Sequence, residues 1–340
     1  MKALEITGHG GPEKLVLREL ADPVAGPGEA LVRVRAAGVN FADLMARAGL
    51  YPDAPKPPCV VGYEIAGLVE AVGSGVEGVA VGDHVFGGTR FGGYAELVAT
   101  PSHALLPLPE GWSFEEGAAF PVNYATAYAG LLRYGALHQG ERVLIHAAAG
   151  GVGIAATQIA KIVGAEIYGT ASASKHDAIR GFGVDHPIDY RTTDFAKAVR
   201  AISGERQPLD LVMDAIAGRG MWKGWSLLRP GGRLVGFGVS AMVDGDRRSV
   251  PRALKAVLTT PLGSVLPLIS DSKAFIGLNM LRLWDSKGSL DEFVDPLRVW
   301  VDEGRLRPFV GATFPLERGG EAHRMLSERR NIGKVVLTVT

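Results

Sequence analysis

Short runs of alternating hydrophobic and polar residues fill the first third of the chain. Glycines and prolines separate these runs, and a two-residue period is typical of strands with one buried face. Together they predict a compact, mostly antiparallel β domain. The runs are Lys2–Ile6, Leu15–Glu19, 29–37, 65–72, 83–86 and 94–99.

From about residue 122 onward, apolar strand patterns alternate with helical ones. A helix pattern over Ile154–Val163 follows the first of these strands, and a second strand follows at βαβ spacing. This alternation predicts a doubly wound parallel sheet of about six strands with helices on its faces. The strand patterns lie at 141–145, 166–170, 210–214, 232–237 and 274–278.

A helical pattern over residues 289–304 is interrupted by a proline. Ser289 and Glu292 have the spacing of a capping box at its start. Pro296 must either kink this helix or begin a shorter one that Asp295 caps.

The remaining pattern predicts how the chain is divided. A helix near 318–328 precedes a strand at 334–339, which we expect to return to the first domain. We therefore predict one domain of residues 1–121 and 288–340, and a second of residues 122–287.

The turn from His146 to Gly153 reads HAAAGGVG and joins an apolar strand to an apolar helix. Glycines let a backbone approach a diphosphate, and a helix N-terminus offers unpaired N–H groups and partial positive charge. Ala148, Gly150 and Gly153 fill the three glycine places of G-x-G-x-x-G, so the first glycine is missing. The turn predicts dinucleotide binding; the alternative is a tight turn without a ligand.

The residues at the end of the second strand indicate whether the dinucleotide is NAD or NADP. NAD enzymes usually carry an acid there for the ribose 2′-hydroxyl, but no acid occurs before Asp177. Ser172, Ser174 and Lys175 instead offer hydroxyls and a cation, which favours the 2′-phosphate of NADPH. Alternatively, Ser174 and Asp177 form a capping box and Lys175 is solvated.

Composition narrows the class of protein. The 340 residues include 36 basic and 36 acidic ones, so nucleic acid is not expected as the main partner. Cys59 is the single cysteine, which excludes disulfides within the chain and cysteine-rich metal sites. Residues 1–6 do not resemble a signal peptide. Outside the cofactor region, the longest uncharged segment is 256–270, which two prolines interrupt and which is too short to cross a bilayer. We expect a cytoplasmic protein without membrane association.

Short glycine-containing motifs recur along the whole chain: Gly38–Asp43, Gly62–Glu64 with Ala66-Gly67 and Val72-Gly73, Val81–Val85, Gly92–Glu96, Ala148–Gly153 and Gly333–Leu337. Together they resemble the medium-chain dehydrogenase/reductase superfamily over the full length, and within it the zinc-free NADPH:quinone oxidoreductase branch. The middle of the chain, from 169–176 through 186–190, is especially similar to the vesicle-amine-transport-protein type. The resemblance implies a Rossmann NADP-binding domain, whose sheet is parallel and doubly wound, and a GroES-like, mostly antiparallel β-barrel domain.

The resemblance also implies that no catalytic metal is present. The zinc-dependent relatives use Cys, His and Cys, and the corresponding positions here are Asn40, Tyr63 and Val122, a poor zinc donor set. Glu64 stands where those relatives keep a carboxylate that supports the zinc ligands from outside the coordination sphere, and here we expect it to be a structural hydrogen-bonding group. Without a Lewis acid, the expected hydride acceptors are molecules that delocalise the charge themselves, namely quinones and α,β-unsaturated carbonyls.

Two residues are the expected catalytic groups. Asn40 can donate through its amide to a carbonyl or to the cofactor, and Tyr51 matches an active-site tyrosine of related enoyl reductases. The alternative for Tyr51 is packing in a Gly/Pro turn, with protons taken from water. Tyr63, Asn123 and Tyr124 are expected to line the substrate pocket, Tyr63 by filling the vacated metal space.

The remaining cofactor contacts follow from the turn and the resemblance. Asn331 and Lys334 are expected near the phosphates, and the strand at Phe275 is expected to pair with its copy in a homodimer. The full expected set is Asn40, Thr126, Ala149, Gly150, Gly151, Val152, Gly153, Thr170, Ser172, Lys175, Tyr190, Phe237, Gly238, Phe275, Ile276, Gly277 and Asn331.

These features predict an NADPH-dependent, metal-independent oxidoreductase acting on quinones or enones. One alternative is an enoyl-thioester reductase, although no basic cluster is evident for an acyl carrier. The other is an NADPH-binding protein that acts at lipid or membrane surfaces. Its support is the apolar stretch at 256–269, which follows Arg247, Arg248, Arg252 and Lys255.

Overall fold

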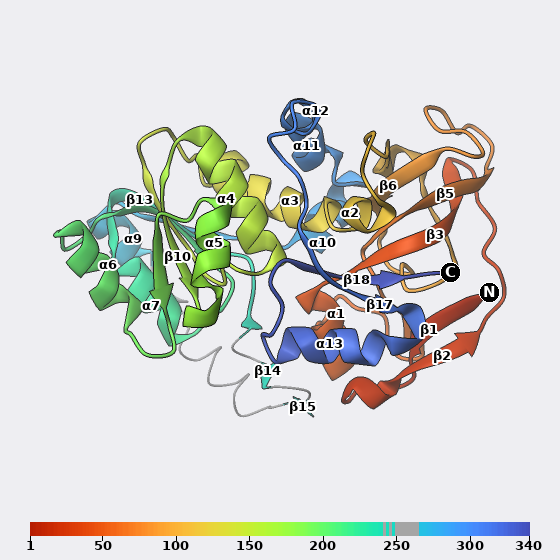
Figure 1. Ribbon diagram of the computed structural model, residues 1–340, viewed down its shortest axis with the longest axis horizontal. Helices are drawn as coiled ribbons and strands as arrows, with labels where there is room; N and C mark the ends of the chain where they lie inside the picture. Colours follow the sequence, from red (N-terminus) through yellow and green to blue (C-terminus); the bar gives the residue numbers. More distant parts are fainter. Residues whose placement is uncertain (241–242, 245–246, 249–264) are drawn as a thin grey trace. The chain divides into compact units, whose positions relative to one another are not determined.

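The computed structural model describes residues 1–240, 243–244, 247–248 and 265–340. Its contacts divide the chain into two compact units. The terminal unit holds Met1–Ala125, Met280–Thr340 and, of the described residues between them, Asp244 and Arg247–Arg248, so that it includes both ends of the chain (Figure 1). The central unit holds Thr126–Val243 and 265–279. The boundary falls inside helix α3 (Pro121–Tyr128). Most of the apolar stretch at 256–269 lies outside the described residues.

The terminal unit is built on a mostly antiparallel sheet of seven strands in the order β17-β18-β3-β5-β6-β8, with β7 also paired to β3. A three-stranded sheet, β2-β1-β4, accompanies it. Its strands are β1 (Lys2–Ile6), β2 (Leu15–Glu19), β3 (Glu29–Val39), β4 (Cys59–Val60), β5 (Glu64–Val72), β6 (His84–Gly88), β7 (Leu97–Pro101), β8 (Leu105–Pro107), β17 (Val310–Pro315) and β18 (Lys334–Thr338).

Helices of this unit lie at strand ends and over its sheets. Ser113 and Glu116 form the capping box that begins α2, and the αL residue Gly49 ends α1. The helices are α1 (Phe41–Ala48), α2 (Phe114–Ala118), α10 (Met280–Lys287), α11 (Asp291–Val294), α12 (Arg298–Asp302) and α13 (Gly319–Ser327), with 3-10 turns at Pro12–Lys14, Ser102–Ala104, Asp295–Leu297 and Leu316–Arg318.

The central unit is a parallel sheet of six strands in the order β11-β10-β9-β12-β13-β16. Counted from β9, this is the 3-2-1-4-5-6 order of a Rossmann fold. The elements are β9 (Arg142–Ile145), β10 (Glu166–Ala171), β11 (His186–Asp189), β12 (Leu209–Asp214), β13 (Leu228–Gly236), β16 (Ala274–Gly277), α4 (Gly151–Val163), α5 (His176–Phe182), α6 (Phe195–Ser203), α7 (Arg219–Trp225), α9 (Leu266–Asp271), a π-helical turn at Ala129–Arg133 and a 3-10 turn at Ala173–Lys175. Two-residue strands β14 (Val243–Asp244) and β15 (Arg247–Arg248) complete the description.

The predicted fold class is confirmed, and the differences lie at element ends. The expected helix over residues 289–304 is three short pieces, α11, a 3-10 turn that contains Pro296, and α12. Leu290 precedes α11, so the predicted Ser289/Glu292 capping box is wrong; the Ser289 hydroxyl accepts from the N–H of Asp291 instead. Pro296 cannot donate an N–H, which explains the break.

Candidate active site

The turn after β9 presents the free end of a long helix. Gly150 is the N-cap of α4 and contributes no side chain to its first turn. The N–H groups of Gly151, Val152 and Gly153 have no earlier helical carbonyl to bond, because the first turn of any helix lacks such partners. These donors, with the positive end of the helix dipole, fit a diphosphate.

The glycines of this turn have two different tasks. A Cβ on Gly153 would lie 2.7 Å from the backbone carbon of Ala148 and still nearer the Ala147 carbonyl oxygen, so only glycine fits. A Cβ on Gly150 would meet the Ala147 carbonyl alone, at 3.3 Å. Gly153 therefore closes the turn, whereas Gly150 keeps its outer side open. The space that a Cβ at Gly150 would fill suits a phosphate group.

Two buried side chains, His146 and Thr170, hold the turn from inside, and a buried carboxylate, Asp214, holds the segment after the neighbouring strand β12. His146 Nδ1 lies 3.0 Å from the Thr170 hydroxyl, and the N–H of Ala147 donates to the same oxygen. Asp214, at the end of β12, accepts from the backbone of Ile216 and Ala217 at 2.7 Å each. The hydroxyl of Thr170, expected to contact the cofactor, is thus committed to the turn. Sequence reasoning missed His146 and Asp214, although both directly end apolar strand patterns.

The end of β10 carries the groups expected at a 2′-phosphate. Ser172 is buried and Lys175 half-buried, while Tyr190 is 36% exposed. Burial lowers the pKa of Lys175, and the Tyr190 phenol opposes that shift, so the two groups interact electrostatically. Helix α5 begins at His176 after Lys175, so the alternative capping box of Ser174 and Asp177 does not form.

The other expected cofactor residues lie in the central unit, except Asn331, which lies in the terminal unit. Ala149 and Thr126 are buried, and the Phe237 N–H donates to the Asp214 carbonyl. Gly238 lets the backbone pass close to Ala215. Phe275, Ile276 and Gly277 belong to the edge strand β16, and Asn331, in the terminal unit, donates to the carbonyl of Gly333.

The terminal unit contains a buried triangle of polar side chains at the starts of β5 and β18 and the end of β3. The Asn40 Nδ2 donates to Glu64 Oε1 at 2.9 Å, and Asn40 Oδ1 accepts from Lys334 Nζ at 2.6 Å. Lys334 also forms an ion pair with Glu64, and both side chains are at least 97% buried. We call Asn40, Glu64 and Lys334 the polar triangle.

Neighbouring residues provide further contacts to the polar triangle. The Val122 N–H donates to the other Glu64 oxygen at 2.8 Å, and Asn123 Oδ1 lies 3.5 Å from the Lys334 ammonium. A Cβ on Gly38 would lie 2.6 Å from the Glu64 carboxylate, so glycine at that position makes room for it. Lys334 is thereby buried against Glu64, whereas the resemblance places it near phosphates.

The three positions of the zinc ligands do not fit a zinc ion. The amide oxygen of Asn40 accepts from an ammonium group, Tyr63 is an un-ionised phenol, and Val122 has an aliphatic side chain. Zinc sites in proteins use thiolate, imidazole or carboxylate ligands. The described residues include no group of three or more His, Cys, Asp and Glu that could hold a metal ion.

Asp43 is hydrogen-bonded both to the segment that carries Asn40 and to the segment that carries Tyr63. Its carboxylate accepts from the N–H of Asn40 at 2.7 Å, the N–H of Gly62 at 3.1 Å and the hydroxyl of Tyr94 at 2.9 Å. Burial raises the pKa of Asp43 to about 7, although these donors oppose the shift. The carboxyl therefore fixes the backbone on both sides of the candidate site.

Aromatic side chains gather around Tyr63. Its ring meets Tyr51 edge-on at 6.4 Å and Phe91 at 5.3 Å between centroids. The Tyr63 hydroxyl is buried and has no hydrogen-bond partner in the described part of the chain. Burial raises the pKa of Tyr63, and that of Tyr51 to about 12. Both phenols are thus uncharged at neutral pH and can donate hydrogen bonds.

The other two expected pocket residues have internal partners. Asn123 is buried and its Nδ2 donates to the carbonyl of Ala119. Tyr124 stacks on Phe120 with ring centroids 4.2 Å apart, and its hydroxyl donates to the carbonyl of Arg307. The structure therefore gives the Tyr124 phenol a position in the core.

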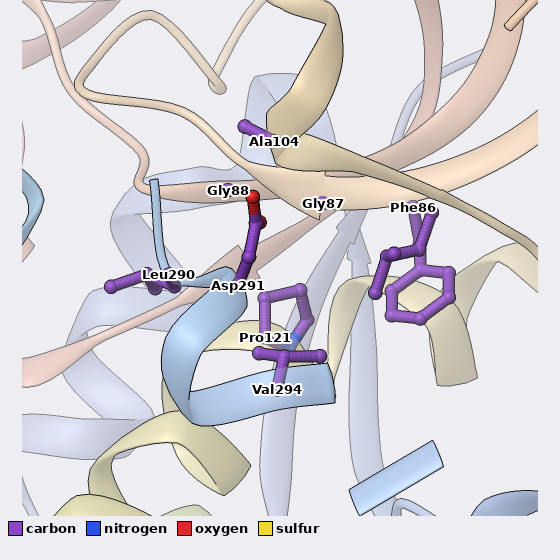
Figure 2. A pocket seen from close by; sticks show the side chains of 9 residues that line it. Phe86, Gly87, Gly88, Ala104, Pro121, Leu290, Asp291 and Val294 are labelled. Atoms are coloured by element: carbon purple, nitrogen blue, oxygen red, sulfur yellow. The ribbon is translucent and has the colours of Figure 1, made fainter. Parts of the chain in front are cut away.

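A small recess in the terminal unit lies apart from these groups. Figure 2 shows the Asp291 carboxyl pointing toward the strand of Gly87 and Gly88, with Leu290 and Val294 beside it. The recess has about 240 Å³ of empty space, part of it open solvent, and none of the expected site residues lines it. It is separate from the groups described above.

Comparison with known proteins identifies the family. Residues 26–110 match the model of the alcohol dehydrogenase GroES-like domain, and residues 182–337 match that of the zinc-binding dehydrogenase. The synaptic vesicle membrane protein VAT-1 homolog of Danio rerio is 42% identical over 339 residues, which cover 99% of this chain and 70% of that protein. The chain belongs to the medium-chain dehydrogenase/reductase superfamily.

Solved structures of this superfamily match over the whole chain. Human synaptic vesicle membrane protein VAT-1 homolog-like protein is 34% identical with a TM-score of 0.86, covering 100% of this chain and 98% of that one. Escherichia coli quinone oxidoreductase complexed with NADPH is 29% identical with a TM-score of 0.86, covering 99% and 100%. The chain thus has the NAD(P)-binding oxidoreductase fold of the branch that contains VAT-1 homologues and quinone oxidoreductases.

Among the described residues, every helix is too short or too polar to span a bilayer.

Proposed function

We propose that this protein is an NADPH-dependent reductase of quinones or α,β-unsaturated carbonyls that works without a catalytic metal. The observation that carries the proposal is the donor set of the terminal unit. The second Nδ2 hydrogen of Asn40 has no acceptor in the described part of the chain, and neither has the buried Tyr63 hydroxyl. Both are neutral donors suited to a carbonyl oxygen, and neither side chain is a usual zinc ligand.

The choice of NADPH rests on the end of β10. Ser172 and the half-buried ammonium of Lys175 occupy the place where NAD enzymes keep an acid. A partly desolvated cation is a good partner for a phosphate and a poor one for a plain ribose hydroxyl. The first turn of α4 would bind the diphosphate through its N–H groups.

When bound, NADPH supplies the hydride, and the acceptor takes up negative charge on its carbonyl oxygen. Asn40 and Tyr63 would donate hydrogen bonds to that oxygen and so stabilise an enolate or quinol anion. Tyr51, with its pKa raised to about 12, holds its proton firmly and suits hydrogen bonding better than full proton transfer. Water can then supply the final proton.

Steady-state turnover tests the proposal. Wild-type protein is mixed with NADPH and an ortho-quinone, a para-quinone, an enone and a crotonyl thioester. We expect turnover of at least one quinone or the enone, and a loss of about a hundredfold in kcat in Asn40→Ala. NADPH binding without reduction of any acceptor would contradict the proposal, and turnover of the thioester alone would favour an enoyl-thioester reductase.

Tyr51→Phe separates the two roles of that phenol. Unchanged kcat would leave Tyr51 with a role in shape only, whereas a fall of about tenfold or more with unchanged KM would assign it a direct chemical role.

We also propose that the protein forms a homodimer through β16. In the described part of the chain this strand pairs only with β13, so its other edge carries unpaired backbone groups. A second copy of the same strand would satisfy them around a two-fold axis. Light scattering should give twice the mass of the chain, and a monomer at micromolar concentration would contradict this.

A further inference from the structure

We propose that Lys334 and Glu64 are positioning residues that fix the orientation of the Asn40 amide, so that it presents a donor and not an acceptor to the substrate carbonyl. This inference rests on the proposed function. The oxygen and the nitrogen of an asparagine side chain have nearly the same shape, so hydrogen-bond partners determine which of them faces which neighbour.

The partners of Asn40 decide that orientation. An ammonium group can only donate hydrogen bonds, and an ionised carboxylate can only accept them. Lys334 Nζ lies 2.6 Å from Asn40 Oδ1, and Glu64 Oε1 lies 2.9 Å from Asn40 Nδ2. If the amide rotated by half a turn, its N–H groups would face the ammonium and its oxygen would face the carboxylate. Both contacts would then be repulsive.

Burial makes this preference strong. The Lys334 side chain is 3% exposed and that of Glu64 is fully buried. Glu64 is itself held by the N–H of Val122 and the ion pair with Lys334. Electrostatic interactions are stronger in such a place than in water, so a half-turn of the amide is disfavoured.

The fixed orientation has a consequence for recognition. One Nδ2 hydrogen of Asn40 is bound by Glu64, and the other is left for a ligand. The backbone N–H of the same residue is held by Asp43, which fixes the main chain at this position. A carbonyl oxygen of a ligand can therefore accept from the remaining Nδ2 hydrogen, while the oxygen of the amide is engaged by the Lys334 ammonium.

This assignment differs from a phosphate contact for Lys334. Its ammonium lies within hydrogen-bond distance of Asn40, Glu64 and Asn123, all in the terminal unit. All three are oxygen acceptors of the protein itself. Loss of the ammonium should consequently affect the Asn40 amide and leave NADPH binding intact.

The test uses a variant that removes both charges together. Lys334→Met alone leaves a buried carboxylate without its partner and can unfold the protein, so it is combined with Glu64→Gln. Lys273→Met is the matched control, because Lys273 is also a buried lysine but contacts Trp225 and Asp271. NADPH affinity, turnover and the Asn40 amide are measured in each protein.

The amide can be observed directly by NMR. The sequence contains four asparagines, so selective ¹⁵N-asparagine labelling gives a short list of side-chain signals: Asn40, Asn123, Asn279 and Asn331. Asn40→Ala identifies the signal that belongs to Asn40. In Lys334→Met/Glu64→Gln we expect this signal to shift and its protons to exchange faster with solvent, with no such change in Lys273→Met.

Kinetics then test whether Lys334 acts through Asn40. We expect kcat to fall by about tenfold in Lys334→Met/Glu64→Gln and NADPH affinity to stay within about twofold. When Asn40→Ala is added, we expect kcat to equal that of Asn40→Ala alone, about a hundredfold below the wild type, because Lys334 and Glu64 act through this amide. Losses that multiply would show independent roles and overturn the proposal. An unchanged Asn40 signal, or a large loss of NADPH affinity, would overturn it too. If the wild type reduces no acceptor, the proposed function fails, while the NMR comparison still decides the positioning role.

Discussion

In the central unit, the groups suited to a diphosphate are backbone N–H groups of one short turn. In the terminal unit, the groups suited to a carbonyl are side chains brought together from distant segments. Residues 146–153 are consecutive, whereas Asn40 and Lys334 are 294 residues apart. The positions of backbone donors depend on the shape of the turn, and the glycines determine that shape. Side-chain donors depend on partners, so a change far away in the sequence can reorient them.

The largest effect is expected from a side chain inside the turn. In Gly153→Val the new Cβ would overlap the backbone of Ala147 and Ala148, and the turn could not close. We expect a loss of more than about 3 kcal/mol in the free energy of unfolding, measured in urea, and no detectable NADPH binding.

Gly150→Ala is the matched control for that variant. Its Cβ would meet only the Ala147 carbonyl, and its backbone φ of −80° suits alanine. We expect near-normal stability but NADPH affinity weakened about tenfold or more, because the methyl group occupies the open side of the turn. Equal stability of the two variants would mean that Gly153 is not needed to close the turn.

A pH effect is expected in the terminal unit. Burial raises the pKa of Asp43 from 3.8 to about 7, so the unfolded chain ionises first as the pH rises. The stability contributed by the protonated form is fully present below about pH 4 and is lost as the pH approaches 7. This amounts to as much as about 4 kcal/mol.

Asp43→Asn removes this titration. The wild type should lose stability between pH 4 and pH 7 and the variant should not, so we expect the variant to gain unfolding free energy relative to the wild type over this range. Urea unfolding at several pH values measures it, and parallel stability curves would show that Asp43 ionises normally.

A smaller effect is expected at the 2′-phosphate. Lys175→Ala should weaken NADPH binding about tenfold and leave NADH binding unchanged, as measured by cofactor fluorescence. Lys161→Ala, on α4 and paired with Asp185, is the control and should change neither affinity. Equal affinities of the wild type for NADPH and NADH would exclude the phosphate role.

The smallest effect is expected at Tyr63. Removing its unpartnered hydroxyl in Tyr63→Phe should leave stability unchanged or raise it by up to about 1 kcal/mol, while kcat/KM falls. Tyr94→Phe, whose hydroxyl donates to Asp43, should instead lower stability by about 1 kcal/mol. Thermal unfolding of both variants tests this difference, and an equal loss in both would mean that the Tyr63 hydroxyl has a partner.

The contrast between a local turn and side chains from distant segments also explains which features could be predicted from the sequence. The parallel sheet of about six strands, the glycine turn and the strand from Lys334 follow from local periodicity and motif, and the structure confirms them. The Ser289/Glu292 and Ser174/Asp177 capping boxes were wrong, because each helix begins one residue later than the spacing indicated. Spacing alone does not determine where the first helical turn closes.

The polar triangle could not be predicted from any local pattern. Lys334 stands at the start of an apolar strand, where a lysine usually reaches solvent, and the resemblance placed it near phosphates. Only the pairing of β18 with β3 brings it to Asn40. Likewise, His146 and Thr170 are separated by a whole helix in the sequence, and neighbouring strands of the sheet unite them.

The placement of β18 also sets the order in which the molecule can assemble during synthesis. The central unit is inserted between the two segments of the terminal unit, so all its strands are made before Lys334. Domains generally fold as their sequence emerges, whereas contacts between distant residues form late. A nascent chain can therefore acquire its nucleotide fold while the amide of Asn40 still lacks the ammonium that orients it, and competence to bind NADPH should precede competence to reduce an acceptor.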